Sequence, residues 1–166
     1  MLRDLRIAER LRHFAARSRF EQLWFVPACI GLGLASLAIG LLAFRRIAPA
    51  LGNHCGTTIP PATASAAGQR RAIQIRRTVQ LAAHYAPWRA DCYPQAIVAR
   101  TLLGLYRLPF ALSMGLKRDP ASGAMQAHAW VQCGNTAVTG DVGGGEYKAV
   151  AVFASRASST GRSVQE

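Results

Sequence analysis

The segment 23–44 constrains the fold of this chain more than any other, because none of its 22 residues carries a charge. It reads LWFVPACIGLGLASLAIGLLAF, and a helix of that length is about 33 Å long, enough to cross the hydrocarbon core of a bilayer. The segment therefore spans a membrane, rests in its interface, or packs on the rest of the protein. Pro27 and the glycines predict a broken helix in the last case.

Arginines flank this segment unevenly. Residues 1–19 predict a basic amphipathic helix with six arginines, whereas only Arg45 and Arg46 follow closely behind. This excess places the N-terminus inside the cell, so a spanning helix would export everything downstream. The long basic region and the long apolar run argue against a cleaved secretory signal. Both a spanning and a non-spanning segment remain open at this point.

The overall charge favours an anionic partner. The 166 residues include 20 basic and 8 acidic ones, a net charge of +12, and length limits the chain to one catalytic domain. An acidic peptide or a membrane surface fits this charge. Nucleic acid fits less well, because the aromatic residues do not alternate with the arginines as they do on a base-stacking surface. We therefore expect no nucleic-acid partner.

The four cysteines are widely spaced, with no C-x-x-C pair and no histidines at the intervals of a closed zinc site. We expect no metal centre and four reduced thiols. They are Cys29, Cys55, Cys92 and Cys133.

Apolar periodicity predicts an α+β fold. Helical spacing after residue 69 predicts a helix that ends near Pro87, and a second helix covers 92–105, with Pro94 in its first turn. Alternating apolar and polar residues then predict an antiparallel meander. Its strands cover residues 110–117, 126–133, 136–139 and 147–153.

The composition also suggests four regions along the chain. Residues 52–68 are rich in Gly, Pro, Thr and Ala without periodicity, which is typical of a linker. The predicted organisation is an N-terminal basic and apolar helical segment at 1–51, this linker, a catalytic domain at 69–154, and a disordered tail at 155–166.

The predicted elements place a nucleophile and a base near each other. Cys92 falls in the first turn of a helix, where the unpaired N–H groups favour a thiolate. His128 lies on a following strand and can transfer protons near neutral pH. Asp141 follows the next short strand and is the candidate for orienting the imidazole. Taken singly, Cys92 and His128 are more often core residues, but their joint placement favours catalysis.

Weaker candidates surround this pair. Trp130 shares a strand face with His128 and is a candidate for substrate binding, although core packing explains it equally well. Gln95, one turn into the helix, could donate to an oxyanion, but a surface amide is the commoner role. Four further residues show no partner pattern and are not expected to act in catalysis: His13, His54, His84 and Cys133.

The same residues carry a family resemblance. The run DCYPQAIVARTLLGL, followed by LPFALSMGLKRD, AHAWVQCGN and TAVTGD, resembles the lasso-peptide biosynthesis B2 proteins over about residues 70–153. The resemblance implies a transglutaminase/papain-like core, and it carries the family's Cys and His onto Cys92 and His128. Its Asp falls on Asp141, in the Gly-rich stretch DVGGGE. Tyr93 departs from the family, in which Leu commonly follows the cysteine.

The resemblance implies a cysteine leader peptidase. Such a protein cuts the leader from a lasso-peptide precursor with a small leader-binding (RRE-type) B1 protein, and an asparagine-synthetase-like cyclase then closes the ring. No cofactor is expected on this chain, and ATP is used by the wider complex. Because precursor and cyclase are cytoplasmic, we expect this protein in the cytoplasm, with membrane association through 23–44 as an option.

Two other functions stay open. The first is a transglutaminase-like acyl transferase, which uses the same thioester and passes it to another amine. The second is a non-catalytic, membrane-associated basic binding module. The reactivity of Cys92 separates the last from the enzymes, because a structural thiol alkylates no faster than a free one.

Overall fold

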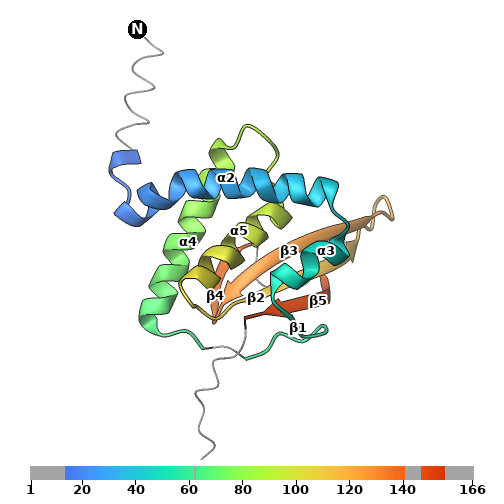
Figure 1. Ribbon diagram of the computed structural model, residues 1–166. Helices are drawn as coiled ribbons and strands as arrows, with labels where there is room; N and C mark the ends of the chain where they lie inside the picture. Colours follow the sequence, from blue (N-terminus) through green and yellow to red (C-terminus); the bar gives the residue numbers. More distant parts are fainter. Residues whose placement is uncertain (1–13, 62, 141–146, 156–166) are drawn as a thin grey trace, which may run out of the picture.

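A computed structural model describes residues 14–61, 63–140 and 147–155 of the chain. In it, helices cover one face of a five-stranded antiparallel sheet (Figure 1). The predicted α+β class is therefore confirmed. The helices are α2 (Arg19–Leu41), α3 (Phe44–Leu51), α4 (Ala66–Tyr85) and α5 (Cys92–Leu105). The strands are β1 (Asn53–His54), β2 (Ala111–Arg118), β3 (Met125–Cys133), β4 (Thr136–Thr139) and β5 (Lys148–Ala154).

The strand order is β1-β5-β2-β3-β4, so the prediction of a simple meander is wrong in one respect. The strands β2, β3 and β4 do follow one another, but β5 crosses over and pairs with the free edge of β2. β2 thereby becomes the central strand, with Leu112 opposite Val131 of β3 on one side and Phe153 of β5 on the other. Local periodicity predicts each strand but not which edge the last one takes.

The helices α4 and α5 pack on the sheet through small and branched side chains. Ile75 and Val79 of α4 and Leu103 of α5 are completely buried, in one cluster with Val131 of the sheet. The helical spacing of these apolar residues forms the buried face, and the arginines of α4 fall largely outside it. This core fixes where α5 begins relative to β3.

Helix α2 is continuous over Pro27 and packs on α4 and α5, so the expected break inside the apolar segment does not occur there. The helix ends at Leu41, and the next helix, α3, begins at Phe44. α2 is the one helix in the described residues that is long and apolar enough to cross a membrane, with a mean hydropathy of 1.9 over its most apolar window.

The predicted linker also contributes to the fold. Residues Asn53 and His54 form β1 at the edge of the sheet, opposite Ala154 and Phe153 of β5. Most of the predicted N-terminal amphipathic helix and the predicted C-terminal tail lie outside the described residues.

Candidate active site

Cys92 is the first residue of α5, as the sequence predicts. Asp91 precedes it in an extended conformation as the N-cap, but the Asp91 side chain accepts no capping hydrogen bond. Pro94 is buried in the first turn and has no N–H to satisfy. Because the first N–H groups of an α-helix have no intrahelical partner, those of Cys92 and Tyr93 are open to an incoming oxygen atom.

His128 lies in β3, opposite Gly115 of β2. Its ring stacks on Trp130 with centroids 6.1 Å apart and an interplanar angle of 20°, so the two share a strand face as predicted. The ring of Tyr147 lies 5.0 Å from it. Gly140, at the end of β4, approaches the Nε2 edge so closely that a Cβ on it would lie 2.9 Å from Nε2. Trp130, Tyr147 and Gly140 therefore surround the imidazole.

Cys92 and His128 are both among the residues that line a cavity of about 300 Å³. Its walls come from α3, the start of α5 and the three strands β2, β3 and β5. Apart from Cys92, Tyr93 and His128, the residues that line it are apolar. The remaining lining residues are Phe44, Met114, Gly115, Leu116, Ala127, Ala129, Val150 and Ala151.

No hydrogen bond joins the Cys92 thiol to the His128 imidazole within the described ranges. The residues Cys92 and His128 thus both line the cavity without forming a closed dyad. This arrangement does not exclude catalysis, since catalytic hydrogen bonds in free enzymes are often long and shorten when substrate binds.

The two weaker candidates differ in their surroundings. The Gln95 side chain donates its amide to the carbonyl oxygen of Ala90 over 2.7 Å, which ties α5 to the loop before it. Trp130 is buried, and its indole ring occupies the space above Gly115. Neither side chain lines the cavity. The oxyanion role of Gln95 and the substrate role of Trp130 remain predictions, and the contacts of Trp130 indicate a support for the imidazole.

Sequence reasoning missed four residues at this site. Phe44 and Tyr93 line the cavity with rings 6.4 Å apart, and Tyr147 and Gly140 contact His128. Burial raises the pKa of the Tyr93 hydroxyl, which has no hydrogen-bond partner in the described structure. Phe44 ends the apolar segment and Gly140 precedes Asp141, but no local pattern marks either as part of the site.

Two of the other thiols, those of Cys133 and Cys29, are less suited to attack a substrate. Cys133 is completely buried, and desolvation raises the pKa of its thiol. The same effect raises the pKa of Cys29 in α2. A raised thiol pKa leaves less of the reactive thiolate at neutral pH.

The remaining expectations concern Asp141 and metal binding. Asp141 lies outside the described residues, although it directly follows Gly140 in the sequence. Across the described residues, no group of three or more His, Cys, Asp or Glu side chains is arranged to hold a metal ion.

Comparison with known proteins identifies the family but no individual relative. No curated protein and no solved structure matches the chain. The model of the transglutaminase-like superfamily, in contrast, matches residues 38–153, from the last turns of α2 to the end of the sheet. That range includes α5 with Cys92 and β3 with His128. The chain therefore belongs to the transglutaminase-like superfamily.

Proposed function

We propose that this protein is a cysteine peptidase that removes the leader from a lasso-peptide precursor through a thioester on Cys92. The observation that carries the proposal is the shared cavity. Its lining includes a cysteine at an uncapped helix start and a histidine on the neighbouring sheet, in a chain of the transglutaminase-like superfamily. These are the parts that amide cleavage by a thiol requires.

The first half of the reaction forms the thioester. His128 takes the thiol proton, and the Cys92 sulfur attacks the carbonyl carbon of the bond between leader and core. The N–H groups of Cys92 and Tyr93 face the developing oxyanion. The carbon–nitrogen bond then breaks, and the imidazolium gives its proton to the departing amine of the core.

The second half releases the leader. A water molecule gives one proton to His128 and attacks the thioester carbonyl, and the carbon–sulfur bond breaks. The leader leaves as a carboxylic acid, which loses its proton to the solvent, and the sulfur recovers its proton from the imidazolium. One water molecule is consumed, and the free thiol is restored.

Asp141 is proposed as the residue that orients the imidazole. Gly140 lies against the Nε2 edge of His128, and Asp141 is the next residue in the chain. A carboxylate that accepts from Nε2–H leaves Nδ1 to exchange the proton with the thiol.

The surroundings of the site agree with a peptide substrate. The cavity walls are mostly apolar, so we expect an apolar side chain of the leader next to the cut to occupy them. The net charge of +12 favours an acidic precursor. The family resemblance supplies the partners: the leader-binding B1 protein and the cyclase, acting in the cytoplasm with ATP used by the wider complex.

An acyl transferase would share every step up to the thioester and differ only in the group that resolves it. The superfamily match supports both enzyme types. Adding a primary amine to the assay separates them, because a transferase would give an amide of the leader instead of its free acid.

The test incubates the protein with a co-encoded precursor and leader-binding partner and identifies the products by mass spectrometry. We expect Cys92→Ala and His128→Ala to abolish leader removal while circular dichroism stays unchanged. Cys29→Ser, Cys55→Ser and Cys133→Ser are the matched controls and should retain activity. Full processing by a folded Cys92→Ala variant would refute the thioester mechanism and leave the binding-module function.

A further inference from the structure

Helix α2 has two apolar faces, only one of which the fold uses. Its outer face carries a stripe of large aliphatic side chains, each at least 57% exposed. This outer stripe consists of Leu23, Val26, Ile30, Leu34, Leu37 and Leu41. Steps of three and four residues place these side chains on one line about 27 Å long. In the helix's most apolar 18-residue window only 17% of the residues are buried, so α2 is not an ordinary core helix.

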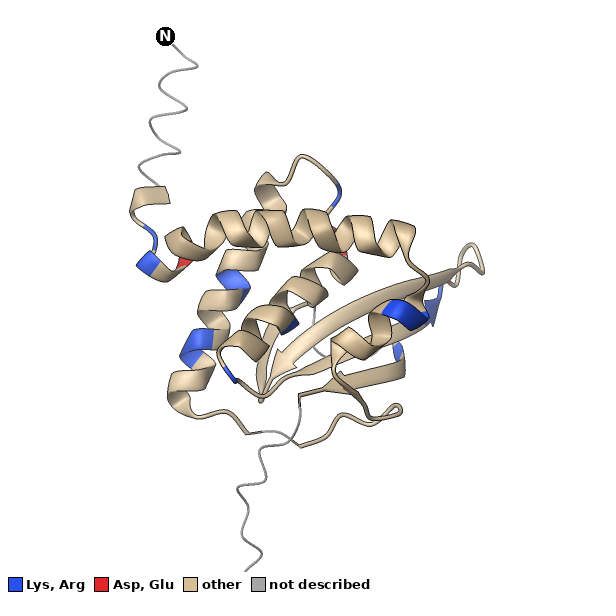
Figure 2. Cartoon of the chain, in the orientation of Figure 1, with Lys and Arg blue, Asp and Glu red and all other residues tan. Residues whose placement is uncertain are grey.

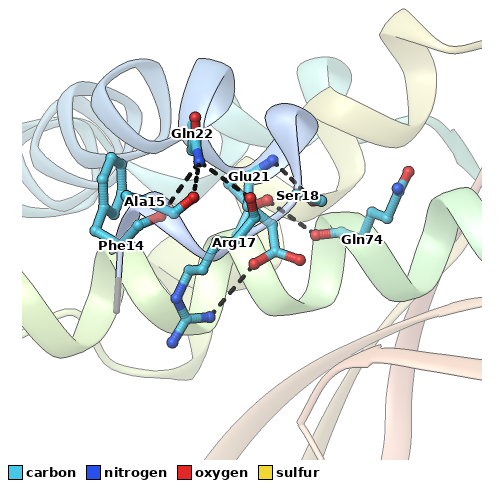
Figure 3. Close-up of polar contacts among 8 residues, drawn as sticks. Phe14, Ala15, Arg17, Ser18, Glu21, Gln22 and Gln74 are labelled. Carbon is cyan, nitrogen blue, oxygen red and sulfur yellow. Dashed lines mark hydrogen bonds and ion pairs between the residues drawn. The ribbon is translucent and has the colours of Figure 1, made fainter. Parts of the chain in front are cut away.

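The inner face holds α2 firmly to the domain. Leu32 is completely buried, and the Trp24 indole donates a hydrogen bond of 2.7 Å to the hydroxyl of Tyr106. At the start of the helix Ser18 caps the N–H of Glu21, and the buried Glu21 carboxylate pairs with Arg17 at 3.3 Å (Figure 3). The Trp24–Tyr106 hydrogen bond and the burial of Leu32 join α2 to the same domain that carries the active site.

The inner contacts argue against a transmembrane helix. A spanning α2 would have to separate from the domain. Separation would expose the part of the core that Leu32 covers. The Trp24 indole would lose its hydrogen bond to the Tyr106 hydroxyl. The fold therefore permits α2 to meet a bilayer only with its outer face, lying in the plane of the membrane.

Positive charge stands at both ends of the outer stripe. Arg17 and Arg19 precede it, Arg45 and Arg46 follow it, and all four are exposed. Figure 2 shows no charged residue in α2 beyond its first turn, which contains Arg19 and Glu21. In the described part of the chain, 14 basic residues face only three acidic ones. Aliphatic side chains bracketed by arginines match the acyl chains and the anionic headgroups of a phospholipid surface.

A groove extends the apolar surface beside the stripe. It has a volume of about 430 Å³ between α2, α3 and α5, and Leu34 of the stripe lies on its wall. Arg46 is the charged residue that lines it. Apolar walls with one cation at the rim suit an acyl chain below a phosphate group better than a polar peptide backbone.

We infer that α2 docks this protein in the plane of an anionic phospholipid bilayer through the outer stripe, with Arg45 and Arg46 contacting the headgroups. The active site then lies close to the membrane surface. Phe44, which lines the cavity of Cys92, is the last residue of the apolar segment and is itself 44% exposed.

The test measures co-sedimentation of the full chain with vesicles of phosphatidylcholine alone or with about a third phosphatidylglycerol. We expect the partition coefficient to be about tenfold or more higher on the anionic vesicles and to fall at high salt. Replacing two stripe residues in Ile30→Gln/Leu34→Gln should lower it by about tenfold or more, because exposed aliphatic side chains supply the insertion. Ile59→Gln, an exposed aliphatic on the loop after β1, is the control and should bind like the wild type.

Three results would overturn the inference. If the wild-type protein stays in the supernatant with both kinds of vesicle, it has no membrane-binding surface. A dimer in lipid-free solution that Ile30→Gln/Leu34→Gln converts to a monomer would assign the stripe to a second copy. Resistance to carbonate extraction would show a spanning helix. Docking is measured without substrate, so its outcome is independent of the proposed peptidase activity.

Discussion

A single methyl group at Gly140 tests whether the structure holds His128 where catalysis needs it. Gly140 has a φ of +68°, a conformation that residues with a Cβ rarely adopt. A Cβ there would lie 2.7 Å from the Cβ of Trp130, 2.9 Å from Nε2 of His128 and 3.1 Å from the carbonyl oxygen of Ala129. Gly140→Ala therefore strains the backbone and pushes on the imidazole and its support.

The two effects can be separated by a control on the same sheet. Gly123 in the β2–β3 turn has nearly the same φ, +70°, but nothing within 4 Å of its virtual Cβ. Gly123→Ala should thus cost only the left-handed strain, about 1–2 kcal/mol of the free energy of unfolding. Gly140→Ala adds overpacking of about 1–3 kcal/mol, for a total of about 2–5 kcal/mol.

Urea unfolding of both variants and the wild type measures this difference. The precursor-cleavage assay should show kcat/KM reduced about 100-fold by Gly140→Ala, because a small displacement of a catalytic group has an effect of that order. Gly123→Ala should leave kcat/KM unchanged. Equal destabilisation by the two substitutions, with full activity of Gly140→Ala, would refute the placement of His128 against Gly140.

Three further predictions concern charge and titration. Asp141→Asn should lower kcat less than His128→Ala does, in the same cleavage assay, because an orienting group adjusts the imidazole whereas the base itself transfers the proton. Iodoacetamide should modify Cys133 more slowly than Cys55 at pH 8, as mass spectrometry of timed samples can show, since burial removes access and raises the Cys133 pKa. Backbone N–H groups of Ser122 and Ala121 lower the Asp119 pKa, so its stabilisation is present at neutral pH and is lost as pH falls below about 4. Asp119→Asn should therefore lower the urea midpoint at pH 7 and approach the wild type at pH 3.

Local patterns predicted the elements that form the catalytic half of the fold. The period of two in β2 and β3 and the Pro94 signal at the start of α5 depend on neighbouring residues only, and they matched the structure closely. The crossover of β5 to β2 was missed, because the choice of edge depends on which strand is left unpaired, and that is a property of the whole sheet.

The residues of the candidate site form the same two groups: those that local patterns predict and those that tertiary packing brings to the site. Cys92 and His128 were predicted because each is tied to a local signal, a helix start or a strand position. Phe44 and Gly140 were not, because they reach the site from α3 and β4 through the packing of elements far apart in the chain. The low reactivity expected of Cys133 follows from burial, which raises the pKa of its thiol and cannot be seen in its sequence neighbourhood.

The apolar segment shows this division most clearly. Its sequence by itself determined that a long uncharged helix would form between clusters of arginines, since composition and length fix hydropathy and helical reach. Only the tertiary structure decided that this helix keeps one face on the domain and exposes the other. The physical reason is that hydropathy sums all the side chains of a helix, whereas burial depends on which of them the neighbouring α4 and α5 can reach.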